Sequence, residues 1–445
     1  MKSFWVFVLL LFPLSLCAQL RLDLEKCIRR AVEADRQLRN DRLESRVKRN
    51  AYVAAIGEVM PEVTAETRFG KRLGRAVDPG TNLFATQDFV EGNLSLNISV
   101  PLFEGFTRIN QIIFQRVNKQ IGEWTESYRE NEVAFSAMEV FYRVLFQEQL
   151  FSLSAEQRRL SERYLQQAEE FVKEGLKAVV DLQDMKARVR ADVYQETVHR
   201  NAYRMAMLEL KQLLWLPPAD SLQIVLPEQQ QLIPVIASAQ EVYDRSVSFL
   251  PQFRLMELRL KASKKNWAMA AGKFSPALWG EIGIYSGYYD TERDEAGKKV
   301  AWKKQLDNHL NQYFGVTLSL PILKGFKNTT GVRIARLQLE QEQNRAEMER
   351  QRLFSEIENA CLSLQSAVDE FRYAGETLRA EEMALRQTEE KWKEGLISVF
   401  ELMETRNRYF TARAEVVRTQ LQYGIKRKTV DFFQGEPLVK AKNER

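Results

Sequence analysis

The sequence contains two similar halves, and this duplication constrains the architecture more than any other feature. Residues 100–106 read VPLFEGF and residues 320–326 read LPILKGF, so that the two prolines lie 220 positions apart. Residues 169–184, EEFVKEGLKAVVDLQD, correspond at the same distance to residues 389–404, EEKWKEGLISVFELME. A duplication of this length predicts two copies of one structural unit that interlock in a single body.

Apolar residues in each copy follow the period of a long helix. In the first copy they recur mostly at steps of three and four, at Val117, Ile121, Trp124, Tyr128, Phe135, Met138, Tyr142 and Leu145. The second copy repeats the pattern at Leu353, Ile357, Ala360, Leu364, Ala367, Phe371, Ala374 and Leu378. Such steps are typical of a coiled-coil seam. They predict helices over 107–172 and 327–392, each about 100 Å long at a rise of about 1.5 Å per residue.

A glycine follows each long helix and predicts a sharp reversal of the chain. Gly175 and Gly395 can adopt the left-handed backbone conformation that such a helix end requires. Shorter helical patterns flank the long helices, at 24–60, 178–214, 240–275 and 398–433. Because two short helices together match the length of a long one, we expect them to stack end to end beside it.

Between these helices the hydrophobic period changes from that of a helix to that of a strand. Residues 93–100 read NLSLNISV, and residues 314–320 alternate in the same way. These patterns predict β-hairpins over 62–100 and 277–320 with strands about ten residues long. A tip that is longer in the second hairpin explains why the repeat offset is 215 upstream of the hairpins and 220 downstream.

Strands with one apolar and one polar face, at this length, can cross a bilayer at a tilt. The side chains predicted to face lipid are Leu94, Leu96, Ile98, Val316 and Leu318, and those predicted to face a lumen are Ser95, Asn97, Thr317 and Ser319. A half-buried hairpin of a soluble protein would show a similar alternation of apolar and polar residues. The N-terminal signal peptide described below and the lack of another apolar face favour strands that cross a membrane. Four strands cannot close a barrel and lipid does not tolerate open strand edges, so two, three or four copies must assemble.

The N-terminus has the features of a secretory signal peptide. Lys2 precedes an apolar run at 4–16, and the small residue Ala18 stands where cleavage is expected. We predict that residues 1–18 are removed on secretion through the Sec pathway. A bulky leucine precedes Cys17, which disfavours lipoprotein processing, but lipidation of this cysteine stays open. No later run reaches about 18 apolar residues, so no membrane-spanning helix is predicted.

Residues suited to catalysis or metal binding are sparse. His199 and His309 have no cysteine or acid pair at ligand spacing, and we interpret them as solvated surface residues. Cys27 and Cys361 are interpreted as small buried residues rather than a disulfide or a metal pair. The net charge of +5, with acids and bases interspersed, indicates solvated helix faces. The sequence therefore predicts no enzyme, no cofactor, no metal and no nucleic-acid partner.

Together, these motifs resemble the TolC-like outer membrane efflux protein family over nearly all of the mature chain. The resemblance rests on the duplicated halves, on the proline and the Gly-Phe pair that end each hairpin, and on the EGL segment at each reversal. It implies an α+β membrane protein with antiparallel α-helical coiled-coil hairpins and a transmembrane β-barrel that oligomerisation completes. The implied assembly is a homotrimer with a 12-strand barrel in outer membrane lipid and a helical tunnel through the periplasm.

The resemblance also orders the segments of the chain. They are the signal peptide at 1–18, a first repeat at 19–214, an equatorial linker at 215–239, a second repeat at 240–433 and a C-terminal tail at 434–445. The linker and the tail would together build the equatorial region.

The implied function is that of a passive exit duct in a tripartite efflux or type I secretion system. A periplasmic adaptor (membrane fusion) protein and an inner-membrane transporter would open the duct and supply the energy. The alternative is a non-conducting periplasmic adaptor or coiled-coil scaffold, which would require a lipoyl-like β-domain that the sequence does not show. Local motifs do not identify the cargo, which could be a drug, a metal ion or a protein.

Four acids follow the reversals at equivalent positions. Glu401 and Glu404 lie six and nine residues after Gly395, and Asp181 and Asp184 lie at the same distances after Gly175. A spacing of three places each pair on one helical face. The family resemblance puts the glutamates at the inner end of the tunnel, where three chains would form carboxylate rings that favour cations. The alternative, favoured for the aspartates, is that the acids are solvated and stabilise the start of a helix.

Two further inferences concern the helix reversals. The tips Gly175-Leu176 and Gly395-Leu396 are predicted adaptor-docking sites, although each leucine could equally cap its own turn. Trp392 and Ile397 stand where well-studied members of the family carry polar groups that latch the aperture. How the aperture is latched in this chain is therefore open.

Overall fold

The computed structural model describes residues 20–77, 83–86, 88–218, 222–225 and 238–438. The predicted signal peptide with Cys17, most of the equatorial linker and the end of the tail lie outside these residues. The chain divides into two compact units that cut across the sequence repeats. We call residues 42–125 and 254–349 the strand unit, and residues 1–41, 126–253 and 350–445 the helical unit.

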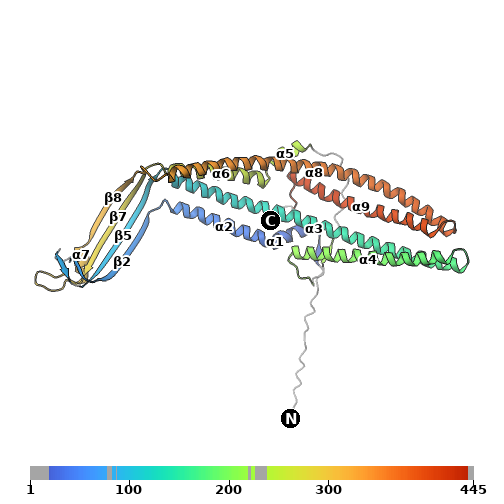
Figure 1. Ribbon diagram of the computed structural model, residues 1–445, viewed down its shortest axis with the longest axis horizontal. Helices are drawn as coiled ribbons and strands as arrows, with labels where there is room; N and C mark the ends of the chain where they lie inside the picture. Colours follow the sequence, from blue (N-terminus) through green and yellow to red (C-terminus); the bar gives the residue numbers. More distant parts are fainter. Residues whose placement is uncertain (1–19, 78–82, 87, 219–221, 226–237, 439–445) are drawn as a thin grey trace, which may run out of the picture. The chain divides into compact units, whose positions relative to one another are not determined.

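The strand unit contains a four-stranded antiparallel sheet in the order β2-β5-β7-β8 (Figure 1). Its strands are β2 (Glu62–Arg72), β5 (Phe89–Glu104), β7 (Ala277–Tyr289) and β8 (Asn311–Ser319). Within the described residues, neither β2 nor β8 pairs with a further strand. The sheet therefore ends in two edges with unpaired backbone groups.

The two hairpins differ in the segment that joins their strands. This segment is 73–88 in the first hairpin and contains β3 (Arg75–Val77) paired with β4 (Phe84–Thr86). In the second hairpin it is 290–310 and contains α7 (Trp302–Asn308). The second segment is thus five residues longer, 21 against 16, which matches the change of repeat offset.

The strand register sorts apolar and polar side chains onto opposite faces of the sheet. Leu96 pairs with Ala65 on β2 and with Ile284 on β7. The next residue, Asn97, pairs with Thr64 and Gly283. Directly opposed residues of antiparallel strands point to the same face. The leucines and isoleucines of neighbouring strands therefore lie mostly on one face. The other face carries small and polar residues together with the aromatic side chains of Trp279, Tyr285 and Tyr313.

The helical unit is built from two long helices and their return helices, with a short parallel pair of strands. The elements are α1 (Leu24–Ala34), α3 (Thr107–Lys173), α4 (Val179–Leu213), α5 (Ala239–Ser246), α8 (Lys327–Lys393), α9 (Val399–Phe433), β1 (Leu20–Leu22) and β6 (Leu222–Ile224). Helices α3 and α8 continue from one unit into the other. Met138, Phe141 and Leu145 of the predicted α3 seam region are fully buried, as is Leu210 of α4.

Each predicted first helix, 24–60 and 240–275, is broken in two. In the first repeat, α1 ends before Asp35, whose Oδ1 accepts the Leu38 N–H over 2.5 Å at the start of α2 (Arg36–Gly57). In the second repeat, α6 (Pro251–Gly272) begins at a proline, which cannot donate a backbone hydrogen bond. Helical periodicity continues across both breaks, which is why the sequence pattern does not reveal them.

No helix in the described part of the chain is long and apolar enough to span a membrane.

Candidate aperture and helix-reversal site

The two glutamates predicted to line the aperture lie on the exposed side of α9. Glu401 is in the first turn, and its backbone N–H donates to Oγ of the N-cap residue Ser398 over 3.3 Å. Glu404 follows one turn later, and both side chains are exposed, whereas Leu402 and Met403 between them are buried. The helix thus packs one face into the protein and presents both carboxylates on the other.

A basic residue lies near one of these glutamates. Arg408 Nη1 is 3.5 Å from Glu404 Oε1, and Arg408 Nε donates to Glu381 Oε2 over 3.2 Å. An exposed pair of this kind contributes at most about 1 kcal/mol to stability. Among the described residues, Glu401 has no ion-pair partner. Of the two carboxylates, Glu401 is therefore the one whose charge no neighbouring base offsets.

The equivalent aspartates lie at the start of α4. Asp181 is half-buried in the first turn, and its backbone N–H donates to the carbonyl of Ala178 over 3.1 Å. Ala178 is the N-cap residue and has no side-chain acceptor to offer. An acid in this turn compensates the partial positive charge of the helix start. Asp184 lies in the next turn and is exposed.

The helix reversals share one hydrogen-bonding pattern. Gly175 N–H donates to Val172 O and Leu176 N–H donates to Phe171 O, and equivalent bonds close the turn at Gly395. Both glycines have a positive φ, 77° at Gly175 and 74° at Gly395. This is the Schellman arrangement, in which glycine avoids the strain of the left-handed region. The leucines that follow, Leu176 and Leu396, are 61% and 70% exposed.

Lys177 joins the two reversals of one chain through backbone carbonyls. Its Nζ donates to Gly395 O over 3.1 Å and to Ile397 O over 2.5 Å, and it lies 5.1 Å from the ring centroid of Trp392. The Trp392 ring packs edge-to-face against Phe171, with 5.7 Å between centroids. Trp392 and Ile397 are both buried. A lysine and an apolar cluster thus hold the two reversals of one chain together.

A buried ion-pair cluster of Ser161, Asp192 and Arg406 lies further along the same helices. Arg406 Nη2 donates to Asp192 Oδ2 over 2.9 Å, Arg406 Nη1 donates to Ser161 Oγ, and the Ser161 hydroxyl donates to Asp192 Oδ2. Gln157 Nε2 also donates to Asp192, over 3.0 Å. The exposed fractions are 0% for Arg406 and Ser161 and 2% for Asp192. The cluster thus links α3 and α4 of the first repeat to α9 of the second, away from water.

The sequence alone does not reveal this cluster, although it contains one signal. Asp192 lies seven residues after the buried Met185, and Arg406 lies four after the buried Leu402, so both occupy apolar positions of their helices. Burial lowers the pKa of the Arg406 guanidinium, and the Asp192 carboxylate opposes that shift. A charged residue at an apolar helix position is informative only when its partner is also known.

Among the described residues, no group of three or more histidine, cysteine, aspartate or glutamate side chains is placed to hold a metal ion. His309 Nδ1 lies at hydrogen-bond distance, 2.8 Å, from the carbonyl oxygen of Gly287, and His309 Nε2 lies 3.4 Å from Glu292 Oε2.

Comparison with known proteins supports the same architecture. Residues 243–436, nearly all of the second repeat, match the profile of the outer membrane efflux protein family. The fold is similar to that of CusC, with a TM-score of 0.78 and 17% identity over 93% of this chain and 92% of that one. It is also similar to the CmeC outer membrane channel of Campylobacter jejuni, with a TM-score of 0.77 and 13% identity over 93% and 87% of the two chains.

The open state of the MtrE outer membrane channel of Neisseria gonorrhoeae gives a TM-score of 0.72 and 17% identity over 92% of this chain and 88% of that chain. At such identities the likeness shows the fold. None of the curated protein sequences compared with this chain matches it significantly. The resemblance and the fold class that the sequence predicts are confirmed.

Proposed function

We propose that this chain, whose second repeat belongs to the outer membrane efflux protein family, is one subunit of an outer-membrane channel. The channel is the passive exit duct of a tripartite efflux or type I secretion system. The observation that carries the proposal is a two-faced sheet with open edges, attached to two helices of 67 residues each. Helices of this length span about 100 Å at about 1.5 Å per residue.

The open edges of the sheet call for partner subunits. Unpaired N–H and C=O groups on β2 and β8 cannot face hydrocarbon, because each would lose its hydrogen bond to water. Pairing β2 of one copy with β8 of the next removes every edge once the ring closes. Three copies give a barrel of 12 strands with the apolar face toward lipid and the polar face toward the lumen.

A native mass measurement in mild detergent tests this assembly. We expect three copies of the mature chain. A stable monomer that inserts into membranes would contradict the proposal, because its sheet edges would have no partners.

The inner end of the duct is proposed to be lined by Glu401 and Glu404. The support is their exposure on α9 and the absence of a compensating base beside Glu401 in the part of the chain described. In a trimer they would bring six carboxylates around one opening and attract cations.

Ion selectivity in planar bilayers tests the aperture. Replacing Glu401 and Glu404 with alanine should lower the preference for cations and weaken block by multivalent cations, without loss of assembly. The matched control replaces Asp181 and Asp184 with alanine and should change neither property. If both double variants change selectivity equally, or if the glutamate variant changes nothing, the constriction is not formed by Glu401 and Glu404.

The exposed tips are proposed to receive a periplasmic adaptor that couples the duct to an inner-membrane transporter. Leu176 and Leu396 are exposed beside turns that a glycine closes, which suits docking against the tip of another helical hairpin. Replacing both leucines with serine should weaken capture of the adaptor but leave the conductance of the isolated channel unchanged.

A further inference from the structure

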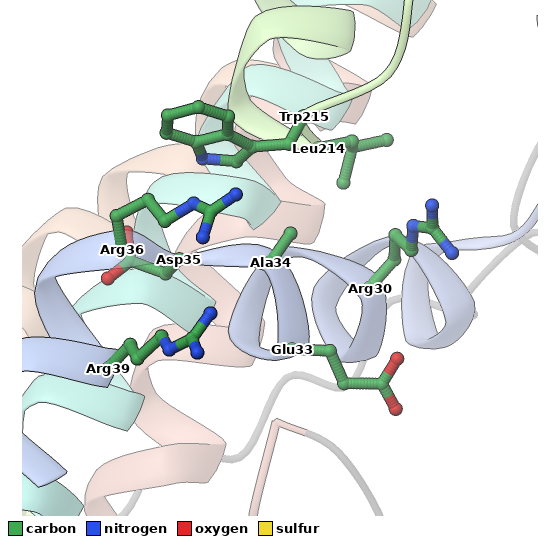
Figure 2. Close-up of a pocket in the computed structure, with 8 residues that line it drawn as sticks. All are labelled: Arg30, Glu33, Ala34, Asp35, Arg36, Arg39, Leu214 and Trp215. Carbon is green, nitrogen blue, oxygen red and sulfur yellow. The ribbon is translucent and has the colours of Figure 1, made fainter.

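A cavity of about 260 Å³ lies where α1 meets α2, beside the end of α4 (Figure 2). The residues that line it are Arg30, Glu33, Ala34, Asp35, Arg36, Arg39, Leu214 and Trp215. All of them belong to the helical unit. The proposed duct makes no use of this cavity.

Three guanidinium groups at the cavity lack acidic partners. Arg30, Arg36 and Arg39 are exposed, and none forms an ion pair among the described residues. Arg36 lies against the ring of Trp215, with its Cζ 4.9 Å from the ring centroid. Figure 2 shows the Arg36 and Arg39 side chains on the same side of the junction, with the indole ring above Arg36.

Among the described residues, the two acids that line the cavity form no ion pair with these arginines. Asp35 Oδ1 accepts the Leu38 N–H over 2.5 Å and so caps the start of α2. The Glu33 carboxylate points away from the guanidinium groups of Arg36 and Arg39 (Figure 2). An incoming anion would therefore meet the arginines without displacing an existing ion pair.

Trp215 occupies a backbone position that favours glycine. Its φ is 52°, and its N–H and that of Leu216 donate to Gln212 O and Lys211 O, which is the Schellman pattern of a helix end. The equivalent residue of the second repeat, 220 positions later, is Gly435, with φ 102°. The first repeat thus has a strained backbone where it places an indole ring, whereas glycine avoids this strain in the second repeat.

The arginine beneath the ring is also specific to the first repeat. At the upstream offset of 215, Pro251 corresponds to Arg36. Arg36 and Arg39 stand in the first turn of α2, which contains no acid, and a spacing of three brings like charges together. The positive φ at Trp215 and the closeness of two like charges are both unfavourable to folding, although the contact of Arg36 with the ring is favourable. Both are explained if the cavity receives a negative ligand.

We propose that this cavity is a carboxylate-binding site formed by Arg36, Arg39 and Trp215, with Arg30 at its far side. Planar guanidinium groups match a carboxylate and donate paired hydrogen bonds to it. The indole ring holds Arg36 in place and offers an apolar surface to the carbon chain of the ligand. The carboxylate comes from an acidic segment of a periplasmic polypeptide or from a free dicarboxylate.

Calorimetric titration of the full mature protein in a nonionic detergent tests the site. The probes are N-acetylated tetraglutamate, glutarate and inorganic phosphate. Arg36→Gln with Arg39→Gln should weaken binding of the carboxylate probes by about tenfold or more, since charged hydrogen bonds are lost. Arg46→Gln with Arg49→Gln is the control, because it removes the same charge at the same spacing further along α2.

A second variant separates binding from stability. Trp215→Gly removes the ring but relieves the positive φ, so the midpoint of thermal unfolding should stay the same or rise while carboxylate binding falls. If Trp215→Gly lowers the midpoint and the unaltered protein binds no carboxylate probe, Arg36 and Trp215 serve only to hold two helices together. That result would overturn the proposal.

The probes also identify the source of the carboxylate. Binding of tetraglutamate but not glutarate supports a polypeptide ligand, and binding of both supports free carboxylates as well. Binding of phosphate alone, or equal loss in the α2 control, would overturn the proposal, because the site would then recognise only negative charge.

Discussion

Replacing Asp192 with asparagine removes one charge of the buried ion-pair cluster without changing its size. Arg406, which is fully buried, would then keep a positive charge with no carboxylate beside it. Breaking a buried pair in this way typically costs about 3–5 kcal/mol. The lower value corresponds to a rise of about 100-fold in the local opening constant, at about 1.4 kcal/mol per factor of ten.

Hydrogen exchange of backbone amides measures this opening. We expect amides of α4 and α9 around the cluster to exchange about 100-fold faster in Asp192→Asn, provided that closing is faster than exchange. The control is Glu156→Gln, which breaks an exposed pair with Arg413, 2.8 Å long, between the same α3 and α9 helices. An exposed pair is worth at most about 1 kcal/mol, so this control should exchange no more than about fivefold faster.

A compensated double variant completes the experiment. Arg406→Met with Asp192→Leu removes the fully buried pair and should return exchange close to that of the unaltered protein. Arg188, whose Nε lies 3.4 Å from Asp192 Oδ1, also loses this partner, but its side chain is 28% exposed. The reasoning would be refuted if this double variant opened as readily as Asp192→Asn, or if Asp192→Asn and Glu156→Gln had equal effects.

Three further perturbations test other parts of the structure. Leu96→Arg should cost roughly 2–4 kcal/mol in barrel stability, whereas Asn97→Arg should be mild, because adjacent residues of β5 point to opposite faces; equal tolerance in a heat-stability assay of the membrane-inserted protein would contradict the register. Gly175→Ala should lower stability by about 1–2 kcal/mol through backbone strain, since no atom beyond the adjacent residues lies within 4 Å of the added carbon; an unchanged midpoint of thermal unfolding would contradict this. Cys27 is buried, and burial raises its pKa to about 12, so it should resist maleimide at pH 8 until the protein unfolds. The pKa of Cys27 is higher in the folded protein than the ordinary value of about 9 expected for the unfolded chain. Its contribution to the free energy of unfolding is therefore complete below about pH 9 and falls as the pH rises toward 12. Cys27→Ala should not show this loss.

Much of the fold was predictable because its signals are local. The seam of apolar residues predicts a long helix at 107–172, and α3 spans Thr107–Lys173. The alternation at 93–100 predicts a two-faced strand, and the pairing of β5 with β2 and β7 sorts the faces as expected. Local signals failed at Asp35 and Pro251, where the helices break but the apolar period continues.

The sequence by itself determined the duplication, the long helices, their glycine reversals and the two-faced strands, because each depends on periodicity or on residues adjacent in the chain. It also placed Glu401 and Glu404 on one helical face, though their role at an aperture stays a prediction. Only the tertiary structure decided that Arg406 meets Asp192 and Ser161, and that Arg36 lies against Trp215. The partners in these contacts are more than 170 residues apart, and packing between helices, rather than any local pattern, brings them together.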